Sequence, residues 1–448
     1  MRPTTRRGFL KGCSTAIAAL AGARFTGFAF GAPYSQPEHD ILVMIFLRGG
    51  FDGLNYVLPV AGPDRALYEA ARPVLRIPAT GANQALPLGS WAGNAWGLHP
   101  GAAPLHELWQ AGRVAFVHCC GMDTPNRSHF ETQAQIELGT PGVATTPSGW
   151  LARHLLTAPA PLTPAVLPGV AISSTVQTSW LGNPEVVAMA SRDDFLLNTG
   201  PYAWRDAQRT ALRAILETGN GYLELTGLAA LDASLTVEQR IGPASSYTPA
   251  NGAVYPTGTF GNAMKLVAQI VKEGLGLRAV TLDLGGWDTH NGQGGATPGS
   301  YYYSLLGQLS RGIHALYTDL DGAGGGNHAQ RLVVVLQSEF GRRVRENADA
   351  GTDHGHGNVM TVVGGGIRGG LYGTWLGLAH GALYDGADLP VTTDYRAVLG
   401  ELISERLGNP NLAAVFPGYT YTNGPGMAVM FQDGFESGDT SRWLATPR

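Results

Sequence analysis

The sequence predicts an α/β fold with a mostly parallel central sheet and helices on both faces of that sheet. Apolar, β-branched runs predict strands that are buried on both sides, as in helix-covered parallel sheets. These runs cover residues 40–50, 112–122, 277–286, 330–342 and 358–366. Segments with helical spacing of apolar residues lie between them, at 101–112, 128–139, 203–218, 260–275 and 301–320. Alternation of strands with helices is typical of an α/β domain.

The composition indicates one large globular domain. Of the 448 residues 44% are hydrophobic, which is enough for a sizeable core. The net charge of −4 argues against a nucleic-acid partner. Two stretches rich in Pro, Gly, Ser and Thr, 72–100 and 140–200, are interpreted as loop-rich insertions over one face of the sheet. We expect the α/β domain to cover residues 40–425.

The first 29 residues resemble a twin-arginine export signal. Arg6 and Arg7 precede a short apolar run, 14–23, and Gly27-Phe28-Ala29 offers a small-x-small cleavage site. The alternative is a basic N-terminal helix or membrane anchor, but the run is too short to span a bilayer. We therefore expect contact with the export machinery in transit, no stable membrane anchor, and a periplasmic or secreted location in a bacterium.

Two further features complete the organisation of the chain. Residues 431–448 follow a Gly/Pro turn and are interpreted as a C-terminal appendage outside the fold. Cys119 and Cys120 are adjacent at the end of an apolar run, a geometry that disfavours a disulfide between them. We expect both to be buried structural thiols.

Carboxylates and imidazoles gather at the expected strand ends, where open α/β sheets bind ligands. The candidates are Asp52, Asp288, His290, Glu339, Asp353, His354 and His356. Zinc binds imidazole nitrogen and carboxylate oxygen, and catalytic sites keep one position open. Two ions can also clamp the attacking and leaving oxygens of a displacement. We expect one or two divalent ions, zinc first, with Mg, Mn or Ca as alternatives.

Each candidate also has a structural interpretation. Asp52 could cap the segment after a turn, Glu339 could pair with Arg342 or Arg343, and the Asp288–His290 stretch could be a turn with a surface histidine. Their joint position at successive strand ends favours a metal site. Histidines that have no other candidate ligand beside them at a strand end are assigned structural roles: His99, His106, His118, His154, His314, His328 and His380.

A hydroxyl nucleophile is suggested by the segment before the helix at 128–139. Ser128 stands at the expected helix start, where free N–H groups and the helix dipole favour an anion. Serine is equally a preferred N-cap, and Glu131 three residues on would complete a capping box. Arg127 could hold an anionic oxygen with two hydrogen bonds.

Several motifs together resemble a known family. "LRGGFDGLN", "NRSHFETQ", "GGWDTHN", "SEFGR" and "DHGHGN" are similar to motifs of the exported family called domain of unknown function 1501, which is placed with the alkaline phosphatase and sulfatase superfamily. The resemblance covers about residues 40–405. It implies an alkaline-phosphatase-like sheet and a one- or two-metal site at the strand ends. It also implies a nucleophile, Ser, Thr or formylglycine, that forms a covalent intermediate on a phosphate or sulfate ester.

The resemblance implies roles for the candidate residues. Asp52 resembles the metal carboxylate of the first strand, and Ser128 the nucleophile. Asp288 and His290 resemble the Asp/His pair of one ion. His354 and His356 resemble later ligands, with Asp353 a ligand or a neighbour of one.

The chain also departs from the superfamily pattern. In "DTPNR", residues 123–127, the sulfatase nucleophile position holds Asp123, which argues against formylglycine and makes Thr124 a rival to Ser128. Glu339 stands where an Asp-His pair is commoner. The sequence thus predicts an exported, metal-dependent hydrolase of small anionic phosphate or sulfate-like esters. The alternatives are a non-catalytic envelope binding or assembly protein, and a purely structural metal site.

Overall fold

The computed structural model describes residues 40–143, 145–160, 165–183, 185–197, 202–243 and 245–429. The predicted signal, 1–29, and the predicted appendage, 431–448, lie outside these residues. Within them, no helix is both long and apolar enough to cross a membrane. Cys119 and Cys120 are buried and free, as expected.

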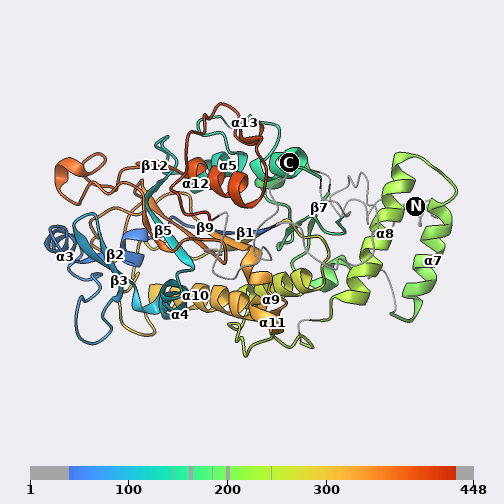
Figure 1. Cartoon of the computed structure of the whole chain (residues 1–448), viewed down its shortest axis with the longest axis horizontal. Coiled ribbons are helices and arrows are strands. Elements are labelled where there is room, and N and C mark those ends of the chain that lie inside the picture. Colours follow the sequence, from blue (N-terminus) through green and yellow to red (C-terminus); the bar gives the residue numbers. More distant parts are fainter. Residues whose placement is uncertain are drawn as a thin grey trace, which may run out of the picture.

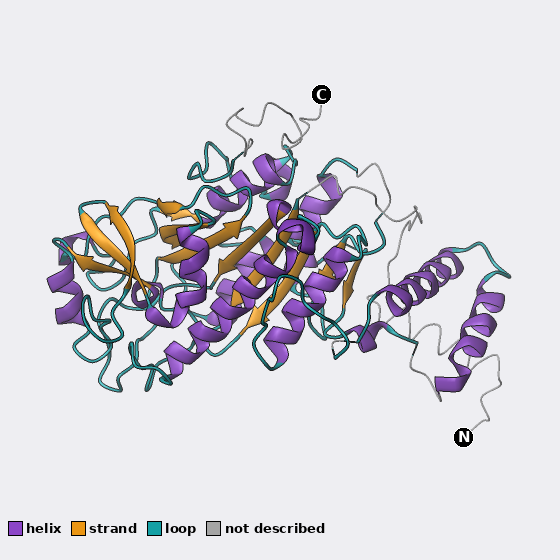
Figure 2. Ribbon diagram, turned by 60° about the horizontal axis from the view of Figure 1, so that its bottom comes forward, coloured by secondary structure: helices purple, strands orange, loops and turns teal. Residues whose placement is uncertain are grey.

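A nine-stranded sheet forms the centre of the molecule and confirms the predicted fold class (Figures 1 and 2). Its order is β11-β5-β10-β9-β1-β8-β6-β7, and β12 pairs with β5. The five predicted strands are β1 (Ile41–Leu47), β5 (Val114–Gly121), β8 (Ala279–Leu284), β9 (Leu332–Gln337) and β10 (Asn358–Gly364). The short strands are β6 (Gly169–Ala171), β7 (Val186–Ala188), β11 (Gly370–Tyr372) and β12 (Thr393–Asp394).

One strand of the sheet, β10, is antiparallel to the others, and its direction determines where the site lies. β10 is antiparallel to both of its neighbours, β5 and β9. Its first residue, Asn358, pairs with Cys120 near the carboxyl end of β5. The loop that leads into β10 therefore lies at the same sheet edge as the carboxyl ends of the parallel strands. At that edge Phe46 of β1 is in register with Gln337 of β9.

Helices cover both faces because the strands alternate their side chains between two apolar clusters. Val43 and Ile45 of β1 belong to one cluster, and Leu42, Met44 and Phe46 belong to the other. The first face packs against α4 (Ala103–Gln110), α9 (Thr259–Lys272) and α10 (Tyr301–Leu320), and the second against α5 (His129–Leu138), α6 (Trp150–Thr157) and α12 (Tyr395–Glu401).

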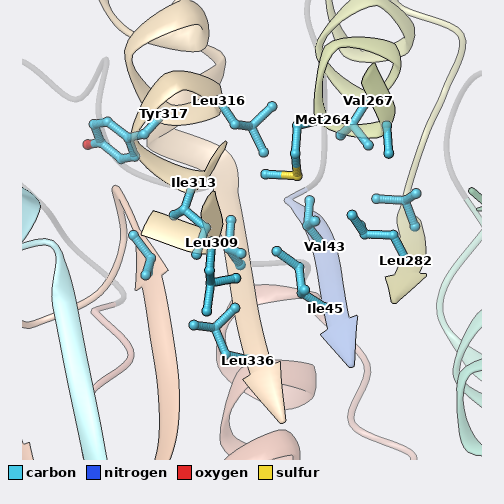
Figure 3. Close-up of a cluster of buried hydrophobic side chains, with 14 of the residues drawn as sticks. Val43, Ile45, Met264, Val267, Leu282, Leu309, Ile313, Leu316, Tyr317 and Leu336 are labelled. Carbon is cyan, nitrogen blue, oxygen red and sulfur yellow. The ribbon is translucent and has the colours of Figure 1, made fainter. Parts of the chain in front are cut away.

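Figure 3 shows the first of these faces in detail. Leu309, Ile313 and Leu316 of α10 point toward the sheet, where Val43 lies on β1 and Leu336 on β9. All of these side chains are almost fully buried. At roughly 1.5–3 kcal/mol per buried aliphatic side chain, this packing fixes the helix against the sheet and so the loops at its edge.

The stretches interpreted as loops hold some regular structure. Part of 72–100 forms β3 (Leu86–Trp91) and β4 (Asn94–Leu98), which pair with β2 (Val57–Ala61) in a small sheet. Residues 140–200 supply α6 and also β6 and β7, which join the central sheet beside β8. The interpretation of 140–200 as an insertion over one face is therefore wrong for these strands. Each strand is three residues long, too short to show a periodic pattern.

The remaining helices lie around this core. The helices α7 (Arg205–Leu216) and α8 (Tyr222–Arg240) stand side by side at one end of the molecule (Figures 1 and 2). The short helices are α2 (Gly53–Tyr56), α3 (Arg65–Ala71), α11 (Gly322–Gly325) and α13 (Leu412–Val415), and a π-helical turn spans Leu402–Arg406.

Candidate metal centre

Three imidazoles and one carboxylate meet at the sheet edge described above. The Nε2 atom of His354 lies 2.9 Å from Nε2 of His290 and 3.0 Å from Nε2 of His129. The Oδ1 atom of Asp288 lies 3.1 Å from His290 Nε2, 3.2 Å from His354 Nε2 and 3.5 Å from His129 Nε2. The ligand atoms of His129, Asp288 and His354 thus lie within 4.8 Å of one another, and His290 Nε2 adjoins two of them, those of His354 and Asp288.

The other ring nitrogen of each histidine faces a hydrogen-bond acceptor. Nδ1 of His129 lies 3.3 Å from Glu339 Oε1, and Nδ1 of His290 lies 3.0 Å from Asp353 Oδ1. Nδ1 of His354 lies 3.0 Å from the carbonyl oxygen of Arg127. An imidazole that donates from Nδ1 carries a lone pair on Nε2. The Nε2 lone pair of His354 consequently faces the Nε2 atoms of both His129 and His290, and Asp288 Oδ1 lies beside all three.

Such an arrangement fits a cation. Two unprotonated Nε2 atoms about 3 Å apart have no hydrogen atom between them, so they repel unless a proton or a metal ion joins them. Histidines that ligate metals characteristically donate their other N–H to a carboxylate or a carbonyl oxygen, which fixes the tautomer. The donor set and its neighbours in this chain match that pattern at all three histidines.

Glu339 is a buried support for His129. Its side chain is 2% exposed, and its carboxylate accepts hydrogen bonds from the backbone N–H groups of Gly49 and Gly50 at 2.9 Å each. Burial by itself would raise the pKa of Glu339, but the hydrogen bonds from His129 and Gly50 outweigh it, so the pKa is lowered. The alternative interpretation, a salt bridge from Glu339 to Arg342 or Arg343, does not match these contacts.

The same hydrogen bond changes the titration of His129. Glu339 raises the pKa of His129 above 6.5, an effect that burial partly opposes. For His354 burial dominates, and its pKa is lowered. The environments of these two neighbouring imidazoles therefore push their pKa values apart.

Arg342 supports Asp288 from the protein interior. Its guanidinium is fully buried and donates from Nη2 to Asp288 Oδ1 at 2.6 Å, while Nε donates to Gly50 O and Nη1 to Thr352 O, each at 2.6 Å. Burial alone would raise the pKa of Asp288, but the hydrogen bond from Arg342 and the charge of Arg342 lower it to about 2. Asp288 is thus a carboxylate at neutral pH.

A glycine lets the first strand approach this loop. Gly49 has a φ of +122°, and a Cβ atom placed there would lie 2.3 Å from the backbone nitrogen of Asp288. No other residue fits both the conformation and the space. The close contact brings the two N–H groups of Gly49 and Gly50 under Glu339 while Asp288 stays beside Arg342.

The centre is open to solvent on one side. The side chains of Asp288 and His290 are 50% and 43% exposed, whereas those of His129 and His354 are 24% and 22% exposed. A ligand can therefore reach the centre from the side on which Asp288 and His290 lie.

Two of the predicted metal ligands lie elsewhere in the structure. Asp52 is fully buried, pairs with Arg72 at 2.5 Å and accepts a hydrogen bond from Gln293 at 2.6 Å. It also caps α2, with Oδ1 3.4 Å from the backbone nitrogen of Asn55. His356 is 6% exposed and packs against Tyr384, with the ring centroids 4.4 Å apart and the ring planes tilted by 37°.

The other predicted ligands lie at the centre and fall into two groups, possible metal ligands and hydrogen-bond partners of those ligands. Asp288, His290 and His354 point ligand atoms at one another. Glu339 and Asp353 contact the outer nitrogens of two imidazoles instead. Asn347 donates from Nδ2 to Asp353 Oδ1 at 3.0 Å and so holds that carboxylate in place. Asp353 has a lowered pKa, chiefly through the hydrogen bonds from Asn347 and then His290.

The predicted nucleophile and anion-binding residues shortly precede His129 in the sequence. Ser128 is the N-cap residue of α5, yet its hydroxyl makes no capping hydrogen bond. Glu131 accepts from Asn126 Nδ2 at 2.9 Å, so the expected capping box is absent from this helix start. Thr124 is exposed on the loop before it. Arg127 forms an ion pair with buried Asp388.

His129 is the member that sequence reasoning missed. It belongs to neither the metal candidates nor the histidines assigned structural roles. It is the first residue of α5, next to Ser128, and the helix start places its ring against Glu339 and His354. The available signal was its position after a predicted strand, in a loop already singled out for chemistry.

Comparisons with known proteins give a partial match. Residues 227–402 match the model of a family described as protein of unknown function (DUF1501), a narrower range than the resemblance expected from the motifs. This range holds Asp288, His290 and His354 but not His129. A comparison with curated proteins found no match. Among solved structures the chain is similar to the crystal structure of PsFucS1 sulfatase from Pseudoalteromonas sp., with 12% identity, a TM-score of 0.33, and coverage of 82% of this chain and 69% of that one. Nothing about activity follows from that likeness.

Proposed function

We propose that this chain is an exported, metal-dependent hydrolase of phosphate or sulfate esters in the alkaline phosphatase and sulfatase superfamily. The observation that carries the proposal is the convergence of three imidazole Nε2 atoms and the Asp288 carboxylate at a solvent-open sheet edge. The proposal of export depends on residues 1–29, which resemble a twin-arginine signal and lie outside the described residues.

The proposed ligand set differs from the set expected from sequence. It comprises His129, His290, His354 and Asp288 around one ion, with Glu339 and Asp353 orienting two of the imidazoles. Asp52 and His356 are left out, because the carboxylate of the first is engaged by Arg72 and the ring of the second packs on Tyr384. An imidazole-rich set suits zinc and other transition ions better than Mg or Ca, which prefer oxygen ligands.

A bound divalent ion would lower the pKa of a hydroxyl or water and neutralise charge on the group being transferred. The chain itself supplies the remaining parts. Ser128 offers an uncapped hydroxyl one residue before His129, at the amino end of a ten-residue helix. Free N–H groups at that helix end favour the anionic ester oxygens. Arg127, whose side chain is 42% exposed, can offer further donors to the same anion.

A second candidate is supported by the number of ligands. Four protein ligands fill a tetrahedral zinc site, and closed four-coordinate sites are typical of structural zinc. In that case the chain would be a non-catalytic envelope binding or assembly protein whose metal fixes the loops. The exposure of Asp288 and His290 favours the hydrolase, because a purely structural site has no need of a solvent-facing side.

Turnover of simple esters separates the two candidates. Full-length protein loaded with zinc, and shown by elemental analysis to contain it, is assayed with p-nitrophenyl phosphate, bis-p-nitrophenyl phosphate and p-nitrophenyl sulfate. The hydrolase predicts turnover that falls at least 100-fold in His354→Ala and in one of Ser128→Ala or Thr124→Ala. Absence of turnover in the loaded wild type on every ester would reject the hydrolase in favour of the structural-metal candidate.

A further inference from the structure

One buried glutamine makes hydrogen bonds to two separate loops beside the metal centre. Gln293 ends the glycine-framed stretch 285–293, and its side chain is fully buried. Its amide oxygen accepts hydrogen bonds from the hydroxyl groups of Thr289 and Thr352, at 2.8 Å each. A carbonyl oxygen has two lone pairs, so these two hydrogen bonds use its accepting capacity fully. The side chain of Gln293 therefore joins the two threonines through one atom.

Both threonines are close in sequence to proposed metal ligands. Thr289 stands between Asp288 and His290, and Thr352 stands two residues before His354. The backbone N–H of Thr352 also donates to the carbonyl oxygen of Thr289 at 3.0 Å. Both threonines are buried, with 3% and 0% of their surfaces exposed. The relative position of the two ligand-bearing loops thus depends on contacts between these threonines, and the glutamine amide reinforces them.

The amide nitrogen of Gln293 is held by a buried ion pair. It donates to Oδ2 of Asp52 at 2.6 Å, and Nη1 of Arg72 donates to the same oxygen at 2.5 Å. A carboxylate can only accept hydrogen bonds, so the nitrogen of the amide must face Asp52 and its oxygen must face the two hydroxyl groups. The side chains of Asp52 and Arg72 are also fully buried. The ion pair therefore leaves the Gln293 amide a single orientation.

Arg72 is itself fixed to a third segment of the chain. Its Nε donates to the carbonyl oxygen of Val344 and its Nη2 to that of Arg343, at 2.9 Å each. The backbone N–H of Arg343 in turn donates to the carbonyl oxygen of Asp353 at 3.0 Å. The guanidinium also neutralises Asp52, whose charge would be strongly destabilising inside the protein without a partner. Asp52, a metal candidate by sequence, thus anchors the loops that carry the ligands.

We propose that Gln293 is a positioning residue that sets the spacing of the metal ligands, and that Asp52 and Arg72 hold it in place. Its side chain bonds Thr289, Thr352 and Asp52 and none of the four proposed ligands, so it acts only through the two loops. A metal site needs its ligands held within about 0.5 Å of the binding geometry, so a small shift between the loops weakens binding. The inference rests on the metal centre of the proposed function, and not on ester turnover.

Zinc affinity tests this role when it is measured by isothermal titration of the full chain, well below the unfolding temperature. Gln293→Leu keeps a similar volume but removes all three hydrogen bonds, and we expect it to weaken zinc binding about ten-fold or more. The matched control is Gln269→Leu on α9, another buried glutamine, whose amide nitrogen donates to Gly242 O at 3.2 Å. Unchanged zinc affinity in Gln293→Leu, or an equal loss in the control, would overturn the proposal.

A milder variant tests the same connection. Thr352→Val removes one hydroxyl group and keeps the shape of the side chain, so we expect a smaller loss of zinc affinity than in Gln293→Leu. Because that hydroxyl acts through the amide, the double variant should bind zinc no more weakly than Gln293→Leu alone. Additive losses would overturn the proposal. Should Gln293→Leu fail to fold, unchanged zinc affinity in Thr352→Val would overturn it. A role in stability alone predicts a lower unfolding midpoint with the zinc affinity of the folded chain unchanged.

Zinc binding and ester turnover together separate this inference from the hydrolase. A wild type that binds zinc without ester turnover, together with the loss of affinity in Gln293→Leu, would reject the hydrolase and support the positioning role. Ester turnover in the wild type with unchanged zinc affinity in Gln293→Leu would reject the positioning role and leave the hydrolase. A wild type that binds no zinc would overturn both proposals.

Discussion

His129 and His354 point their Nε2 atoms at each other across 3.0 Å, although each already faces an acceptor with Nδ1. Two lone pairs in this position are stable only with a positive charge between them. Asp288 completes the ring of donors at 3.2 Å from His354. The pair joins the start of α5 to the loop before β10, and these two segments are more than 200 residues apart in the sequence. The centre therefore exists only in the folded chain.

His129 is expected to be as necessary for metal binding as His354. Replacing His129 by alanine removes one imidazole from the donor set, and we expect at least a ten-fold loss of zinc affinity in isothermal titration of the full chain. Ser128→Ala, one residue earlier, removes no donor and serves as the control. Wild-type zinc affinity in His129→Ala would show that the ion, if bound, lies among the other ligands alone.

Glu339 is expected to act through His129 without touching the ion. Glu339→Gln keeps the shape of the side chain but weakens its hold on the Nδ1 proton, and loss of such an outer partner typically lowers metal affinity 10–100-fold. The exposed Glu405→Gln provides a control for the loss of one negative charge. Zinc affinity that falls equally in both variants would attribute the effect to overall charge and contradict the orienting role.

Gly49 is expected to tolerate no side chain. Gly49→Ala forces a Cβ to within 2.3 Å of the Asp288 backbone and places alanine at a φ of +122°, which costs about 1–3 kcal/mol from the conformation alone. We expect a lower midpoint of thermal unfolding together with weaker zinc binding. Gly285→Ala is the matched control in the facing loop, since a Cβ there has no heavy atom within 4 Å. Equal effects of the two substitutions would refute the close-approach argument.

His118 is expected to make the fold sensitive to acid. It is fully buried, lies 4.6 Å from Trp96 and 5.2 Å from Trp375 between ring centroids, and burial lowers its pKa from 6.5 to about 3. Below pH 6.5 the unfolded chain takes up a proton that the folded chain refuses, so stability falls as the pH drops toward 3.

His118→Phe should remove this contribution. Between pH 7 and pH 5 the free energy of unfolding should fall by about 2 kcal/mol less in the variant than in the wild type, as measured by urea denaturation. Identical pH dependence in wild type and His118→Phe would contradict the assignment.

The long elements could be predicted from sequence because their apolar patterns are local. All five strand runs and all five helical segments named from sequence are present in the structure. The three-residue strands β6 and β7 were missed, since they carry too few residues to show a period and exist only because β8 provides a partner. The antiparallel direction of β10 likewise depends on tertiary pairing.

The site could be predicted only in part, for a similar reason. Asp288, His290 and His354 lie in glycine-framed loops whose composition already suggests metal binding. Asp52 has the same appearance in sequence, yet it is paired with Arg72 inside the protein, and Gln293, more than 200 residues away, donates a hydrogen bond to the same oxygen, Oδ2. His129 was overlooked because it is the first residue of a helix. Ser128, directly before it, had already been interpreted as the N-cap or nucleophile of that segment.

The central claim is that His129, His290, His354 and Asp288 bind one ion together. Zinc K-edge X-ray absorption of the full chain, loaded and then dialysed, measures this donor set directly. We predict one equivalent of zinc with three imidazole nitrogens and one oxygen from the protein at about 2.0–2.2 Å, plus at most one further oxygen from solvent. A protein that retains no zinc, or a spectrum with fewer than three imidazoles, would contradict the account.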